Sequence, residues 1–303
     1  DEQREQLEAL FRTHTSTEWE ALCDAAGTEG AICRTSEEWL ANEQALGSEI
    51  VIDTEDPVLG AVRAPGIHVR MSRTQPPAPR ARSLPDADRA AVLASLNRAM
   101  PSLAASEPPL RAALEGIRVV DLCIVLAGPT CDSTLAEFGA DVVKVDSPSR
   151  KMVAFHNDIN RAKRSIVLDL KSEEGLSVFW RLVADADVVV QNFRKGVAER
   201  LGIGYDDVRA RRPDIVYASL NTYGQVGPWA GRPGHEQIAQ AASGMQERYG
   251  GAGRPTLAPF AVNDYGTGFM GAYGVALALL HRQRTGEGQH VDSALAYTAT
   301  MLQ

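Results

Sequence analysis

Apolar runs alternate with helical segments over residues 113–222, and this alternation constrains the fold more than any other feature. Continuous apolar runs are typical of strands buried on both faces, and we expect such strands at 116–122, 140–146, 165–169, 187–191 and 214–219. Helices are expected between them, at 129–138, 172–184 and 206–211. The alternation predicts an α/β fold: a Rossmann-like open parallel sheet with helices on both faces.

The chain ahead of this region predicts a small α+β domain over residues 1–72 and a linker over 73–112, with the sheet domain at 113–303. Thr17 with Glu20, and Thr35 with Glu38, fit the capping box and predict helices at 17–26 and 36–46. Strands at 49–52 and 60–63 are expected to pair as a hairpin. Prolines exclude regular structure from most of the linker, apart from one helix expected at 86–99.

Composition excludes several classes of protein. With 44% hydrophobic and 23% charged residues, the chain is an ordinary globular one, and no run approaches the 18 apolar residues of a membrane span. A net charge of −8 argues against a nucleic-acid partner. The four cysteines form no CxxC pair, which indicates no metal site and favours buried, reduced thiols in a cytoplasmic protein.

Candidate chemistry lies in loops. The first predicted strand leads to Leu126-Ala127-Gly128-Pro129, which is not a dinucleotide or P-loop fingerprint, so a ligand is expected at the switch point of the sheet. Asp264 precedes a helix rich in small residues. It is either a structural N-cap or a nucleophile that the helix dipole keeps ionised. His235 is either an ordinary surface residue or a proton shuttle.

Several separated motifs resemble family III CoA-transferases, the formyl-CoA transferase and carnitine CoA-transferase group. The matching strings cover about 115–300 and include GIRVVDLCIVLAGPTCDSTLAEFGADVVKVDSPS, DVVVQNFRKGVAERLGIGYDD and VNDYGTGFMGAYGVALALLHRQRTGEG. Residues 1 to about 75 resemble the carboxy-terminal part of the same family, notably EWEALCDAAGTEGAICRTSEEW. This inverted order is expected of a junction within a tandem double CoA-transferase, and fits a circular permutation less well.

The resemblance implies that Asp264 forms an anhydride and then an aspartyl-CoA thioester, so that CoA passes from an acyl-CoA to a carboxylic acid. It implies CoA as the carrier, no metal or redox cofactor, and a homodimer or tandem pseudo-dimer. Lys171 and Arg200 would meet the CoA phosphates. The full set of CoA contacts carried over by motif position is Val125, Ala127, Leu168, Lys171, Asn192, Phe193, Arg200 and Leu201.

The chain departs from formyl-CoA transferase at two positions, and two alternative functions remain open. Leu126 and Ser147 stand where formyl-CoA transferase has glutamine and arginine, which argues against oxalate as the acceptor. The family that the chain resembles also contains the 2-methylacyl-CoA racemases, and their two bases would correspond to His235, in a Gly-His-Glu string, and Asp264. A non-catalytic structural half of a tandem transferase is the other alternative.

Overall fold

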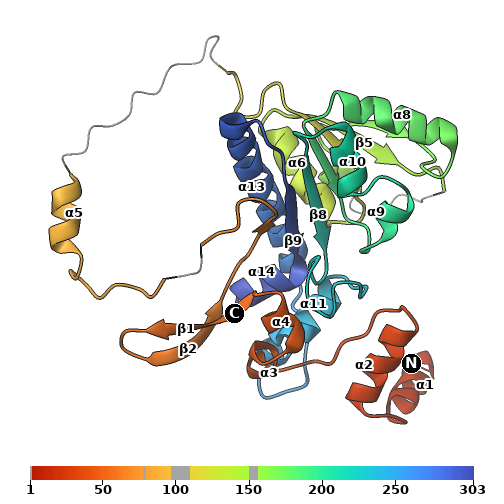
Figure 1. Ribbon diagram of the computed structural model, residues 1–303. Helices are drawn as coiled ribbons and strands as arrows, with labels where there is room; N and C mark the ends of the chain where they lie inside the picture. Colours follow the sequence, from red (N-terminus) through yellow and green to blue (C-terminus); the bar gives the residue numbers. More distant parts are fainter. Residues whose placement is uncertain (1, 78–79, 97–109, 150–155) are drawn as a thin grey trace.

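A seven-stranded sheet forms the centre of the protein, seen in a computed structural model that describes residues 2–77, 80–96, 110–149 and 156–303 (Figure 1). Its strand order is β3-β9-β8-β7-β4-β5-β6. All neighbouring strands are parallel except β3 and β9, which are antiparallel. The strands are β3 (Arg70–Met71), β4 (Arg118–Asp121), β5 (Asp141–Asp146), β6 (Arg164–Val167), β7 (Val188–Gln191), β8 (Val216–Asn221) and β9 (His290–Ala294). The predicted open parallel α/β sheet is confirmed, with the antiparallel edge strand β3 as an addition.

Helices cover both faces of this sheet, as predicted. One face packs on α6 (Ala127–Glu137) and α13 (Val262–Thr285), whose small residues allow close packing against the strands. The other face packs on α8 (Glu173–Ala184), α9 (Val197–Arg200) and α10 (Tyr205–Arg211). Apolar burial on both faces explains why the strands read as continuous apolar runs.

The direction of chain winding reverses at β4. From β4 the chain builds outward through β5 and β6, and then returns to the other side of β4 to add β7, β8 and β9. The loops after β4 and β7 therefore diverge at the carboxyl edge of the sheet. Such a divergence leaves a crevice where ligands of open α/β sheets bind.

The amino-terminal segment forms helices and a separate two-stranded sheet. Its elements are α1 (Glu2–Phe11), α2 (Ser16–Ala25), α3 (Ser36–Leu40), α4 (Glu43–Gly47), β1 (Val51–Asp56) and β2 (Gly60–Pro65). Thr15 caps α2, with Glu18 completing the box, so the cap predicted at Thr17 is wrong by two residues. The helix predicted over 36–46 is two helices, because Asn42 is extended and its side chain caps α4.

This segment shares a hydrophobic core with the sheet domain. Trp39 is buried, and its indole N–H donates to Thr300 Oγ1 at 2.8 Å. Strand β3 pairs with β9 in the large sheet. Packing is therefore continuous across the boundary predicted at residue 72, which stays a prediction. The shared core consists of Trp39, Ala45, Ile50, Val51, Tyr223, Trp229, Ala242, Ala294, Ala296 and Tyr297.

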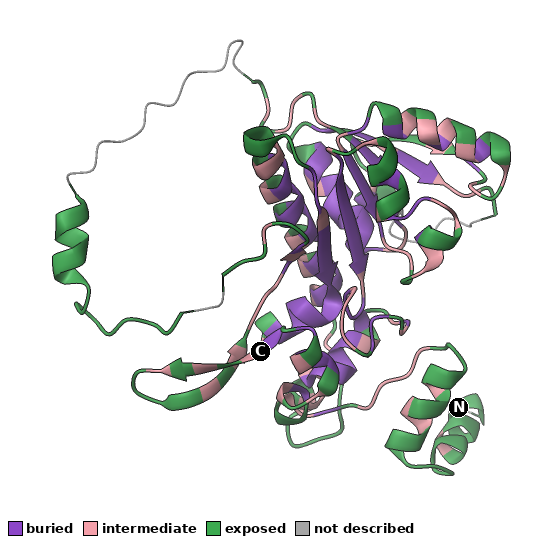
Figure 2. Cartoon of the chain, in the orientation of Figure 1, coloured by how far each residue is buried: buried purple, intermediate pink, exposed green. Residues whose placement is uncertain are grey.

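The predicted linker carries one short helix, α5 (Arg89–Ser95), which lies far from the sheet and is exposed along its length (Figures 1 and 2). The predicted helix extended over 86–99, of which residues 97–99 lie outside the described ones. Sequence reasoning gave no range for β3, β9 or six of the helices. Two of these helices are α1 and α9, described above, and the others are α7 (His156–Ile159), α11 (Glu236–Ser243), α12 (Met245–Gly250) and α14 (Leu295–Met301).

Two further expectations concern the chain as a whole. Within the described ranges, no helix combines the length and the apolarity needed to cross a membrane. All four cysteines are free. Cys123 and Cys131 are buried as predicted, whereas Cys33 is exposed and Cys23 is intermediate, so burial was predicted correctly for two of the four.

Candidate active site

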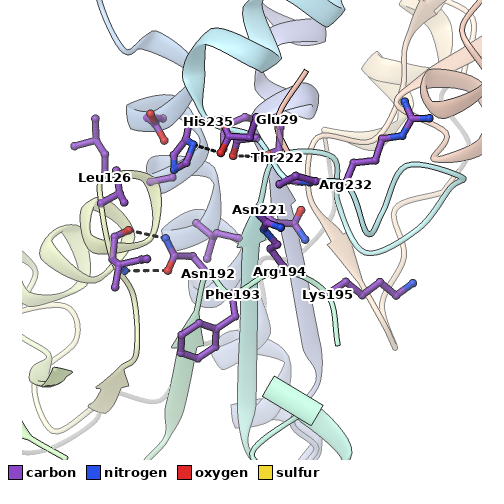
Figure 3. A pocket seen from close by; sticks show the side chains of 18 of the residues that line it. Glu29, Leu126, Asn192, Phe193, Arg194, Lys195, Asn221, Thr222, Arg232 and His235 are labelled. Atoms are coloured by element: carbon purple, nitrogen blue, oxygen red, sulfur yellow. Dashed lines mark hydrogen bonds and ion pairs between the residues drawn. The ribbon is translucent and has the colours of Figure 1, made fainter. Parts of the chain in front are cut away.

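A cleft of about 390 Å³ opens at the switch point of the sheet (Figure 3). The loops after β4, β7 and β8 line it, together with the starts of α11 and α13. Four of the predicted CoA contacts line this cleft, and so does the predicted nucleophile Asp264. Those four contacts are Val125, Ala127, Asn192 and Phe193.

Three helices begin at this cleft. The residues that precede α6, α11 and α13 provide no capping hydrogen bond from a side chain. Two of their first-turn N–H groups bind side chains of the site: Ala127 donates to Asp264, and Asp264 donates to Glu236. The dipoles of the three helices add positive potential at the cleft. An anionic group in the cleft is stabilised by this arrangement.

Asp264 is the third residue of α13 and not its N-cap, a position that Ala261 occupies. The structural capping role that the sequence allowed is therefore wrong. Its side chain accepts a hydrogen bond from the Ala127 backbone N–H at the start of α6. The carboxylate thus lies between two helix starts, and it is 9% exposed, which leaves an opening to the cleft.

The acidity of Asp264 departs from the sequence expectation that the helix dipole keeps it ionised. Burial, reinforced by the negative charge of Glu236, raises the pKa of Asp264 to about 7. The His235 charge and the Ala127 N–H act in the opposite direction, but they are the smaller contributions. Desolvation outweighs the dipole here, so the carboxyl group titrates near neutral pH.

Glu236 fixes the start of α13, a role that sequence reasoning missed. This buried carboxylate accepts from the Asp264 backbone N–H at 2.7 Å and from Asn263 Nδ2 at 2.8 Å. It also accepts from Gln240 Nε2 at 2.8 Å. The sequence around Glu236 gives no signal that its side chain will be buried, because Asn263 and Asp264 lie 27 and 28 residues further along the chain.

His235 lies in the same cleft as Asp264. Its Nδ1 is 2.6 Å from Glu29 Oε1, and Figure 3 shows the two side chains pointing toward one another. Glu29 belongs to the loop between α2 and α3, so the amino-terminal segment supplies part of the cleft wall. Sequence reasoning did not identify Glu29, since only tertiary packing brings it to the site.

The loop after β4 has a strained backbone. Val125 has φ of 65°, a left-handed conformation that is costly for a β-branched residue. Asn192 holds the loop in place: its Oδ1 accepts from the Ile124 N–H at 2.9 Å, and its Nδ2 donates to the Ile124 carbonyl at 2.6 Å. Both the oxygen and the nitrogen of the Asn192 amide therefore bind the Ile124 backbone.

The other four predicted CoA contacts do not line the cleft. Leu168 is buried, and Leu201 packs against the same hydrophobic core. Lys171 and Arg200 are exposed and follow β6 and β7 in the chain, on the same edge of the sheet. Their assignment to the CoA phosphates stays a prediction.

Three other cations line the cleft and are held by nearby groups. Arg194 Nη1 donates to the Gly27 carbonyl at 2.9 Å, and Lys195 Nζ donates to the Gln225 carbonyl at 2.8 Å. Arg232 pairs with Asp24 at 3.1 Å. Arg194 and Lys195 are exposed at the mouth of the cleft and retain capacity to bind an anionic ligand.

One cluster in the described chain brings together potential metal ligands. Ligand atoms of Asp121, Cys123 and Asp132 lie within 4.8 Å of one another, all buried. Lys163 already pairs with Asp121 at 2.9 Å. Burial and the neighbouring Asp121 hold the pKa of the Asp132 carboxyl well above its usual range. A neutral carboxyl beside a lysine is a poor cation site, and the predicted absence of a metal stays a prediction.

Comparison with known proteins identifies the family. The family model described as CoA-transferase family III matches residues 1–89 and 114–303. The chain belongs to CoA-transferase family III. The resemblance noted in the sequence is thereby confirmed at the level of the family, and the α/β sheet described above is the fold of this family's solved members.

Individual relatives cover part of the chain. A succinate–glutarate CoA-transferase of Agrobacterium fabrum is 38% identical over 208 residues, 62% of this chain and 52% of the relative. Human alpha-methylacyl-CoA racemase is 39% identical over 196 residues, 63% of this chain and 51% of the relative. The crystal structure of a CAIB/BAIF family protein from Brucella suis superposes with a TM-score of 0.59 at 35% identity, covering 64% and 56% of the two chains. The chain therefore spans about half the length of the curated relatives it matches.

Proposed function

We propose that the protein transfers CoA between an acyl-CoA thioester and a carboxylic acid, with Asp264 as the covalent nucleophile. The observation that carries this proposal is the Asp264 carboxylate, nearly buried yet open to the cleft where α6, α11 and α13 begin. Family membership supports the reaction class, and relatives named for CoA transfer between dicarboxylic acids support the substrate class.

The reaction requires four acyl exchanges at one carboxylate. An Asp264 oxygen attacks the thioester carbonyl carbon, and the C–S bond breaks to give a mixed anhydride and the CoA thiolate. The thiolate attacks the aspartyl carbonyl and expels the donor acid as a carboxylate. The acceptor carboxylate then attacks the aspartyl thioester and displaces the thiolate. That thiolate finally attacks the acceptor carbonyl, which yields the new acyl-CoA and restores the Asp264 carboxylate.

The surroundings of Asp264 suit these exchanges. Each step develops negative charge on a carbonyl oxygen, and the positive dipole ends of the three helices that begin at the cleft can stabilise it. Glu236 holds the Asp264 backbone in place, so the attacking oxygen is pre-positioned. A pKa of about 7 leaves a large fraction of Asp264 ionised at neutral pH while increasing its basicity.

We place the CoA along the carboxyl edge of the sheet, from the cleft toward Lys171 and Arg200. Arg194 and Lys195 at the mouth would favour a donor or acceptor acid with a second carboxylate. Leu126 is apolar where an amide would be needed for oxalate. The alanine variants of Lys171 and Arg200 should each weaken CoA binding by about 1 to 3 kcal/mol. Unchanged affinity at low salt in both variants would contradict this placement.

The decisive experiment follows the covalent intermediate by intact-protein mass spectrometry. After incubation with succinyl-CoA, the wild type should gain the mass of CoA less one water, and hydroxylamine should convert the adduct to a hydroxamate. Peptide mapping should place it on Asp264. Asp264→Asn should form no adduct, while Asp185→Asn, an exposed control, should behave as the wild type. An adduct on another residue would refute the assignment.

Racemisation at the α-carbon of a 2-methylacyl-CoA is the second candidate. The positions of His235 and Asp264 favour it, because both side chains line one cleft and the Asp264 carboxyl group has a pKa of about 7. Deuterium uptake at the α-carbon in heavy water distinguishes the two reactions. Uptake that depends on His235, without CoA exchange to any acid, would establish racemisation in place of transfer. We expect His235→Ala to leave CoA transfer measurable.

We also propose that the chain works as a homodimer or as part of a tandem pseudo-dimer in the cytoplasm. Two separate segments, residues 1–89 and 114–303, match one family model. The sequence motifs of the amino-terminal segment resemble the carboxy-terminal part of that family. The buried free thiols of Cys123 and Cys131 suit a reducing compartment. Light scattering coupled to size exclusion tests the assembly, and a monomer at micromolar concentration would contradict the homodimer.

A further inference from the structure

Glu29 reaches the cleft from a loop that is firmly held. The Ile32 N–H donates to Glu20 Oε1 at 3.0 Å, and Arg34 binds both oxygens of the same carboxylate, at 2.8 and 2.6 Å. Gly30 packs so closely on Cys23 that a Cβ there would lie 2.6 Å from the Cys23 side chain. The position of Glu29 is therefore set by packing on both sides, which is what a positioning role requires.

The loop is also tied to the cleft itself. Arg194, from the loop after β7, donates to the Gly27 carbonyl, and Arg232 pairs with Asp24 of α2. Arg232 lies three residues before His235, so both partners of the Glu29–His235 pair are fixed relative to the same network. The pair is 31% exposed on the glutamate side and 52% on the histidine side. An ion pair this exposed adds little to folding stability. Its effect on the protonation state of the His235 ring is the more important contribution.

The pair determines which ring nitrogen of His235 carries a proton. A carboxylate can only accept a hydrogen bond, so Nδ1 is the protonated nitrogen while Glu29 is ionised. Nε2 has no protein partner within the described residues, and His235 lines the cleft. In a free neutral imidazole either nitrogen can carry the proton, and the hydrogen bond of one nitrogen selects the state of the other.

We propose that Glu29 is a positioning residue of the active site, which holds His235 in the Nδ1–H tautomer and thereby presents Nε2 to the ligand in the cleft beside Asp264. The tautomer of His235 does not depend on the proposed function. The effect of Glu29 on catalysis does rest on it. The charged groups that line the cleft with His235 are Glu29, Arg194, Lys195, Arg232 and Asp264. Of these, Glu29 is the one paired with the ring, its Oε1 lying 2.6 Å from Nδ1.

The first test is nitrogen NMR of the His235 ring in the full chain, independent of activity. At a pH where the ring is neutral, wild type should show a protonated Nδ1 and an unprotonated Nε2. Glu29→Gln should lose this preference, because a glutamine amide can donate as well as accept. Glu29→Asp should retain it in part, and Glu37→Gln, an exposed glutamate on α3, should match wild type. A predominant Nε2–H tautomer in wild type would overturn the proposal.

The second test is a double-mutant cycle on the rate of Asp264–CoA adduct formation at saturating succinyl-CoA. Glu29→Gln should lower this rate about tenfold with unchanged CoA affinity, and should have no further effect when His235 is already alanine. An equal loss in both backgrounds would mean that Glu29 does not act through His235. A wild type that forms no adduct, yet shows the Nδ1–H tautomer, would refute the proposed function and leave the role of Glu29 in the tautomer intact.

Discussion

Replacing Asp264 with asparagine should stabilise the folded protein at pH 8 and have a much smaller effect near pH 4. The pKa of Asp264 rises from 3.8 to about 7 on folding, mainly because the carboxyl group is buried. Each unit of pKa shift corresponds to about 1.4 kcal/mol, so a shift of about three units corresponds to about 4 kcal/mol. The asparagine variant avoids this cost because its side chain carries no charge at any pH.

The sign follows from proton binding. Below pH 4 the carboxyl group is protonated in both folded and unfolded chains, so it costs no stability. Between pH 4 and pH 7 the unfolded chain releases the proton while the folded chain retains it, and wild type loses stability as the pH rises. Above pH 7 both states are ionised and the loss is complete. The advantage of Asp264→Asn should therefore grow by about 1.4 kcal/mol per pH unit in this window.

Urea unfolding of both proteins at half-unit steps from pH 4 to pH 8 measures this difference. Other buried acids titrate in both proteins, so their effects cancel in the comparison. Asp185→Asn, which removes an exposed carboxylate, is the matched control and should show a nearly constant difference from wild type. If the difference between Asp264→Asn and wild type does not change across the series, the carboxyl group does not titrate near 7 and the electrostatic reasoning is wrong.

Three further outcomes are expected. Glu236→Gln removes a charge that raises the pKa of Asp264, so adduct formation should persist to lower pH, and an unshifted pH profile would contradict this. Asn192→Ala loses both hydrogen bonds to the loop after β4, and urea unfolding should show a loss of about 1 to 3 kcal/mol. Gly268→Ala would place a Cβ 2.7 Å from a backbone carbonyl oxygen of α6 and should cost about 1 to 3 kcal/mol in the same assay. Gly231→Ala, which has open space, should be neutral or slightly stabilising; equal losses in the two variants would refute the packing argument.

Sequence patterns predicted helices and strands well where contacts between residues close in the sequence decide the structure. The capping box at Thr35 and the hairpin of β1 and β2 were found where the sequence placed them. Strand β9 was missed because His290–Ala294 mixes polar and apolar residues, and it becomes a strand only by pairing with β8 and β3. The tertiary partner, and not intrinsic preference, decides such a segment.

The sequence by itself determined the α/β sheet, its switch point and Asp264 as the candidate nucleophile, because apolar periodicity and short motifs encode these features directly. Only the tertiary structure decided the environment of that residue. Its pKa depends on burial and on Glu236, and the cleft is completed by Glu29 from the opposite end of the chain. Desolvation and contacts between distant segments exist only once the chain is folded, so no local pattern could have shown them.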